Sequence, residues 1–251
     1  MGQRWANFWS EWSWPKIIGE TLIIVVGVFL GLQASNWNDD RVERAETIHV
    51  LRDLKPELRN LIGNFRTLTE YYAVTRKYAD TAFAGWRGDP GVSDRQFVIA
   101  AYQASQNTFT GINNGSWSQI FGSDRLRNLD DQTLRDELAI LMTTDFTVLE
   151  QELFTDYRKH VRQVIPEDVQ DAIRAQCGDQ RVGNLGYIRL PPSCTIDLPD
   201  DRFAAAAKAL RAQPGLVGEL RWHFAAVASY VGNLDNLAVI SRRVLHRIET
   251  I

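Results

Sequence analysis

The sequence has no run of basic residues, few cysteines and no catalytic motif, and each absence narrows the range of functions. Its 28 Lys and Arg residues are nearly balanced by 31 Asp and Glu residues, which gives a net charge of -3. Proteins that bind nucleic acid carry clustered positive charge, so this balance argues against a nucleic-acid partner. The sequence also has no internal repeat, which argues against a repeat architecture.

Motifs that carry chemistry are missing as well. The sequence contains no phosphate-binding loop and no GxSxG nucleophile elbow, and its two cysteines have no histidine nearby. No metal-ligand spacing such as HExxH includes any of the four histidines, which are His49, His160, His223 and His246. We therefore predict that the protein is not an enzyme and has no cofactor and no metal.

One pair of residues has a spacing that permits contact. Glu219 and His223 stand one helical turn apart in a predicted C-terminal helix. We expect a carboxylate–imidazole contact between them on the helix surface. The alternative is that the pair binds a metal together with groups from another helix.

What the sequence does contain is one long apolar stretch near its beginning, IIGETLIIVVGVFLGLQASNW, from Ile17 to Trp37. A helix of this length reaches about 30 Å, which is roughly the thickness of the hydrocarbon core of a bilayer. We predict a membrane-spanning helix over residues 16–37, and the alternative is a buried helix of a soluble protein. A signal peptide needs small residues at its cleavage site, but here Leu32 precedes Gln33 and Ala34, so we expect an uncleaved anchor.

Aromatic residues flank this stretch as they flank membrane helices at the water interface. Residues 1–15 are predicted to form an amphipathic segment along the membrane surface, and the alternative is a disordered leader. The predicted interface residues are Trp5, Phe8, Trp9, Trp12, Trp14 and Trp37.

Two features inside the span bear on function. Gly27, Gly31 and Ser35 are four residues apart, and such a strip of small residues lets another helix approach closely. Glu20 is an acid within the membrane segment, for which a partner cation or a proton-linked role is one interpretation. The other is that Glu20 lies one turn inside the helix start, where the helix dipole stabilises a carboxylate and water is near.

The cysteines decide the predicted orientation, because basic residues are nearly even on the two sides of the span. Cys177 and Cys194 enclose a segment rich in turn-forming residues, and a disulfide would close it in an oxidising compartment. Two reduced cysteines are the alternative. We expect a bacterial inner-membrane protein with its N-terminus in the cytoplasm and residues 38–251 in the periplasm.

Residues 38–251 are predicted to form an all-α antiparallel bundle with long heptad-patterned helices. Apolar residues alternate by three and four from Leu51 to Ala79 and again from Leu220 to Ile248. Pro56 is expected to kink the first of these helices or to start a new one. A further long helix is predicted from Asp130 or Asp131 to Pro166, with shorter helices between. The segment YIRL is expected to form a minor strand.

The segment GETLIIVVGVFLGLQASNWNDDRVER resembles an uncharacterised family of bacterial single-pass membrane proteins. In that family a helix that begins with Gly-Glu precedes an Asn-Trp-Asn-acidic-acidic-Arg signature, which residues 36–41 match. SWSQIFGSDRLRNLDDQTLRDEL resembles it more loosely. The resemblance implies a membrane-anchored helical domain and supplies no activity.

Two functional hypotheses follow from these patterns. The first is a non-catalytic membrane-anchored scaffold or accessory subunit that associates with itself or with a larger membrane complex. The alternative is a periplasmic helical-bundle module that binds a small ligand, as sensors do. An interior with converging polar groups such as Arg221, His223 or Tyr157 would favour the alternative, whereas a filled apolar core would favour the scaffold.

Overall fold

The computed structural model describes residues 14–109, 117, 129–183 and 187–251. Its fold is all-α, as predicted. The described helices are α2 (Trp14–Asp53), α3 (Lys55–Trp86), α4 (Asp94–Gln103), α6 (Gln132–Thr143), α7 (Phe146–Gln151), α8 (Asp156–Val164), α9 (Glu167–Cys177), α10 (Asp200–Arg211) and α11 (Gly215–Thr250). A small antiparallel hairpin pairs β1 (Gln180–Val182) with β2 (Tyr187–Arg189), which confirms the minor strand.

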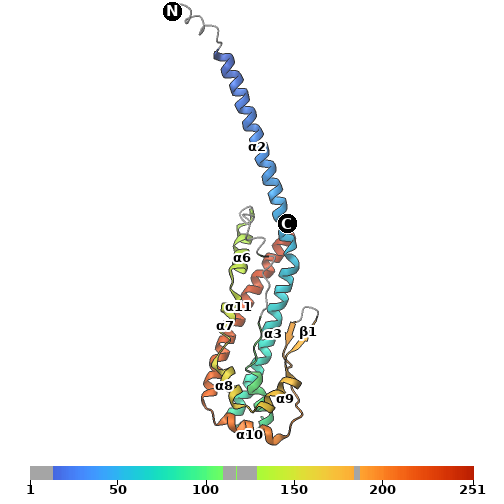
Figure 1. The fold of residues 1–251 in the computed structure, drawn as a ribbon, viewed down its shortest axis with the longest axis vertical. Helices are drawn as coiled ribbons and strands as arrows, with labels where there is room; N and C mark the ends of the chain where they lie inside the picture. The colour runs from blue at the N-terminus through green and yellow to red at the C-terminus, as the bar shows by residue number, and fades with distance from the viewer. Residues whose placement is uncertain (1–13, 110–116, 118–128, 184–186) are drawn as a thin grey trace, which may run out of the picture.

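Helix α2 leaves the bundle as a long rod, and the C-terminal end of the chain lies beside its junction with α3 (Figure 1). The break between the two helices falls at Leu54, and Pro56 stands in the first turn of α3. Proline lacks a backbone N–H, and the first turn of a helix is where this donor is not needed. Pro56 therefore starts a new helix, which was one of the two predicted outcomes.

Helices α3 and α11 pack against each other in antiparallel directions. Arg59 pairs with Glu249 near one end at 2.6 Å, whereas Arg76 lies 5.3 Å from the Phe224 ring centre near the other. Every position of the first apolar stripe is buried: Leu51, Leu54, Leu58, Leu61, Phe65, Leu68, Tyr72, Thr75 and Ala79. In the second stripe Val231 and Leu245 are half-buried and the other positions are buried.

Helix α4 packs on the far end of α3 and begins with a capping box. The Ser93 hydroxyl accepts a bond from the Gln96 N–H at 3.2 Å, while the Gln96 side chain accepts from the Ser93 N–H at 2.9 Å. Gly85 on α3 permits the close approach of α4, because a Cβ there would lie 2.2 Å from Cδ2 of Phe97.

The prediction of one long helix between Asp131 and Pro166 is wrong, because this segment forms α6, α7 and α8. The Asp145 carboxylate caps α7 by accepting from the N–H groups of Thr147 at 2.9 Å and Val148 at 3.3 Å. A second break follows Gln151. The apolar positions of the segment nevertheless face inward, since six of the ten are buried and the other four are half-buried: Leu134, Leu138, Leu141, Leu153, Tyr157 and Val161, then Met142, Phe146, Leu149 and Val164.

Cys177 at the end of α9 forms a disulfide with Cys194. The chain between them carries the hairpin, which lies against α3: the Tyr78 hydroxyl donates to the Pro191 carbonyl at 2.8 Å. The disulfide therefore closes a segment that is already fastened to the bundle.

Candidate functional site

The first candidate site is the apolar half of α2, which is long and apolar enough to span a membrane. Its large side chains lie free of the rest of the described chain, and Ile23 is 72% exposed. Glu20 and Trp37 are also exposed. A Cβ added at Gly27 or Gly31 would meet no atom within 4 Å, so no described part of this chain covers that strip, and Ser35 in it is exposed too.

Most of the predicted interface aromatics cannot be placed. Trp5, Phe8, Trp9 and Trp12 lie outside the described residues. Trp14 is the first residue of α2, and its side chain lies outside the described part of the structure. The predicted surface segment over residues 1–15 therefore stays a prediction.

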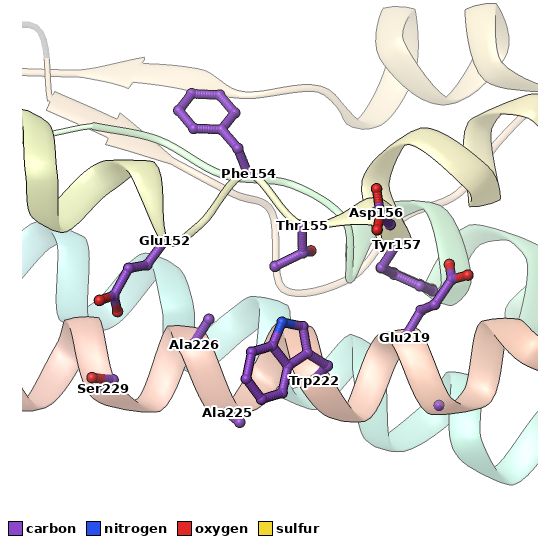
Figure 2. A pocket seen from close by; sticks show the side chains of 11 residues that line it. Glu152, Phe154, Thr155, Asp156, Tyr157, Glu219, Trp222, Ala225, Ala226 and Ser229 are labelled. Carbon is purple, nitrogen blue, oxygen red and sulfur yellow. The ribbon is translucent and has the colours of Figure 1, made fainter.

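The second candidate site is a groove of about 770 Å³ between α11 and the segment that joins α7 to α8 (Figure 2). Acids line it from both walls, with Glu152 and Asp156 on one and Glu219 on the other. Trp222, which is 70% exposed, lies between Glu152 and Glu219 in this view. A groove with carboxylates and an exposed indole suits an organic cation, because the ring face attracts positive charge.

Beneath this groove, His223 is fully buried. Its Nδ1 lies 2.8 Å from the Thr155 hydroxyl oxygen, and its Nε2 has no hydrogen-bond partner among the described residues. Burial, together with the positive charge of Arg158, lowers the pKa of His223 to about 4. His223 is therefore neutral near pH 7 and does not supply positive charge to the site.

The expected contact between Glu219 and His223 is wrong. Glu219 Oε1 instead lies 2.8 Å from His160 Nδ1 on α8. The reason is that α8 packs beside α11 and brings a different partner to each residue. His160 on α8 contacts half-buried Glu219. Thr155, just before α8, bonds with buried His223. Within the described part of the chain, no cluster of three or more His, Cys, Asp or Glu residues could hold a metal.

Three buried tyrosines pack together in the bundle interior. The Tyr72 ring packs edge-on against Tyr71 at 5.4 Å and against Tyr230 at 5.6 Å between ring centres. Desolvation raises the pKa of all three phenols, so each stays protonated. Tyr71 donates to Asp179 at 3.0 Å, whereas the Tyr230 hydroxyl has no hydrogen-bond partner among the described residues. Tyr72 donates to the Thr108 carbonyl at 2.7 Å, which holds the chain beyond α4 against α3.

The named candidates for an interior ligand site do not converge. Tyr157 is buried and donates to the Ala101 carbonyl at 2.8 Å, whereas Arg221 is exposed and does not line the groove. His223 bonds with Thr155. The interior at these positions is filled, and the open volume lies on the surface beside them.

Sequence reasoning did not find the groove. The groove arises at the break between α7 and α8, where the sequence predicted a continuous helix.

No family model, curated protein or solved structure matches this chain. The family resemblance carried by residues 36–41 therefore stays a prediction.

Proposed function

We propose that this protein is a non-catalytic, membrane-anchored scaffold or accessory subunit that associates with itself or with a larger membrane complex. The observation that carries the proposal is the apolar half of α2, whose side chains project from the folded domain with nothing from the described chain against them. Such a surface is stable in lipid or against another helix.

The proposed arrangement places the N-terminus in the cytoplasm and the bundle in the periplasm of a bacterial inner membrane. The disulfide between Cys177 and Cys194 supports this placement, since disulfides persist in oxidising compartments. The Gly27, Gly31 and Ser35 strip is the proposed contact for a partner helix, which is a second copy or a membrane subunit.

Cross-linking in native membranes tests both parts of the proposal. We expect the full-length protein to sediment with membranes, to stay there through a high-salt wash, and to give cross-linked species after detergent extraction. The Gly27→Leu and Gly31→Leu variants are expected to remain in the membrane fraction and to lose most of the cross-linked species. Bulky side chains there would separate the two helices without a clash inside this chain.

The matched control is Val25→Leu, which adds bulk to an exposed position away from the strip and is expected to cross-link as the unaltered protein does. Recovery in the soluble fraction without detergent would refute the anchor. A strictly monomeric protein with no co-purifying membrane partner would refute the scaffold.

The groove favours a second candidate function, a ligand-binding module that takes an organic cation. Titration calorimetry with tetramethylammonium chloride, against sodium chloride at equal ionic strength, is expected to give saturable binding. Trp222→Ala should weaken it by about 5- to 30-fold, the value of a cation–π contact of about 1 to 2 kcal/mol. Val239→Ala, an exposed position on α11 outside the groove, should leave it unchanged. Equal binding by the Trp222 variant would rule out this candidate.

A further inference from the structure

Three arginines, two on α8 and one on α9, contact residues at the C-terminal end of α4 and just beyond it. Arg162 lies over the Tyr102 ring with its Cζ 4.6 Å from the ring centre. Arg174 on α9 donates to the Tyr102 hydroxyl at 3.4 Å. Arg158, one turn before Arg162, donates to the Ser105 carbonyl just beyond α4 at 2.6 Å. We call Arg158, Arg162 and Arg174 the arginine cluster.

Neutral oxygen atoms hold two members of the cluster in place. Besides Ser105, Arg158 donates to Gln106 Oε1 at 3.2 Å, and Arg162 donates to the same oxygen at 2.9 Å. Among the described residues, neither arginine has a carboxylate within ion-pair distance. Other half-buried arginines of this domain do: Arg95 reaches Asp200 at 2.6 Å, and Arg247 reaches Asp131 at 2.7 Å.

The positive charge of the cluster is incompletely balanced by the acids around it. Asp171 is bonded to Arg174, which is the exposed member of the cluster. Asp179 accepts from the Tyr71 hydroxyl at 3.0 Å, and desolvation raises its pKa although Arg158 and Arg162 act in the opposite direction. Like charges one helical turn apart repel each other. Burial and the charges of Arg158 and Arg174 accordingly lower the pKa of Arg162.

The guanidinium groups keep donors for a further partner. Each carries five N–H donors in a planar fork that matches a carboxylate or phosphate edge. Among the residues that the structure describes, the bonded atoms are Nη1 of Arg158 and the Nε and Nη2 atoms of Arg162. Arg158 and Arg162 are half-buried, so they are partly desolvated and still reach the surface, where a charged hydrogen bond is strong.

We propose that the arginine cluster binds a small oxyanion with two negative charges, a phosphate group or a dicarboxylate. Such a ligand neutralises the excess charge of the cluster and accepts from the remaining N–H groups of the three guanidinium groups. The protein fixes the guanidinium groups beforehand through Gln106, Ser105 and Tyr102, which lowers the cost of ordering them on binding. This site is separate from the α11 groove, whose acids repel an anion, and it does not depend on the membrane function.

Titration of the full-length protein in neutral detergent with sodium phosphate or sodium succinate tests the site, with sodium chloride at equal ionic strength as the reference. We expect saturable heat and a raised midpoint of thermal unfolding with at least one of the two oxyanions. Phosphate alone identifies a phosphoryl ligand, succinate alone identifies a dicarboxylate, and either supports the proposal. An effect that chloride reproduces is charge screening and overturns it.

Arg162→Gln is expected to weaken binding at least tenfold, because it removes one charge and three N–H donors from the centre of the cluster. Arg221→Gln, an exposed arginine on α11, is the matched control and should bind as the unaltered protein does. Arg158→Lys keeps the charge but loses the planar fork, so it should bind several-fold more weakly, and it decides the matter if Arg162→Gln does not fold. Unchanged affinity in the folded cluster variants would overturn the proposal.

Discussion

Acidification from pH 7 to pH 4 is expected to lower the free energy of unfolding by about 3 kcal/mol through His223 alone. The pKa of a histidine in an unfolded chain is about 6.5, and burial lowers the pKa of His223 in the folded protein to about 4. Each pKa unit is worth about 1.4 kcal/mol, and the difference between the two states sets the size of the effect.

The sign follows from which state takes up the proton first. Between pH 6.5 and pH 4 the unfolded chain binds a proton at this residue and the folded protein does not, so acid favours unfolding. Above pH 6.5 both states are neutral, and the full contribution to stability is present. Below pH 4 both are protonated, so the loss caused by His223 is complete.

Urea unfolding of His223→Asn measured from pH 8 to pH 4 isolates this residue. An Asn side chain can still bond with the Thr155 hydroxyl and does not titrate, so the variant should lose about 3 kcal/mol less than the unaltered protein over this range. His246→Asn, an exposed position on the same helix, should follow the unaltered protein. Parallel pH profiles for the His223 variant and the unaltered protein would contradict this prediction, because they would show that His223 binds a proton equally well in the folded and unfolded states.

The sequence predicted the buried faces of the helices better than the ends of the helices. The alternation by three and four predicts which side of α3 and α11 is buried, because this spacing depends only on helix geometry. The signal at Pro56 was also informative, because a proline in the first turn of a helix acts locally. The long middle helix was wrong although its apolar positions do face inward.

Both breaks in that segment fall beside a Thr-Asp pair, Thr144-Asp145 and Thr155-Asp156. Asp145 caps α7, and the Thr155 hydroxyl bonds with His223 on α11 at the break before α8. A Thr-Asp pair is typical of the start of a new helix. The prediction of one long helix followed the apolar periodicity instead. The groove that results could not be predicted, because it depends on which residues of α11 lie opposite the second break.

The arginine cluster was visible in part. Arg158 and Arg162 stand four residues apart, so the sequence already places two like charges on one face of a helix. Tyr102, Ser105 and Gln106 lie more than fifty residues earlier and meet these arginines only through the packing of α4 against α8. Contacts of this kind are set by the tertiary structure and leave no local pattern in the sequence.

The second large expected effect concerns the disulfide. Replacing Cys177 and Cys194 together by alanine is expected to lower the free energy of unfolding by about 3 kcal/mol, the loop-closure estimate for cysteines 17 residues apart. The enclosed segment holds the hairpin against α3 through Tyr78 and Pro191, and the Cys177 carbonyl accepts from Gln103 at 2.7 Å. Opening the loop gives the unfolded chain more freedom and leaves these contacts to hold the segment alone.

Urea unfolding of the detergent-solubilised protein, with and without reductant, measures this effect. Reductant should destabilise the unaltered protein to the level of the double alanine variant and leave that variant unchanged, which separates disulfide loss from any effect of the substitutions. Equal stability of the oxidised and reduced forms would contradict the expectation.

Alkylation of thiols in intact cells, followed by reduction and a second label, tests the compartment with the same two residues. A periplasmic bundle takes up only the second label, because its cysteines are bonded in the cell, whereas a cytoplasmic bundle with reduced cysteines takes up the first.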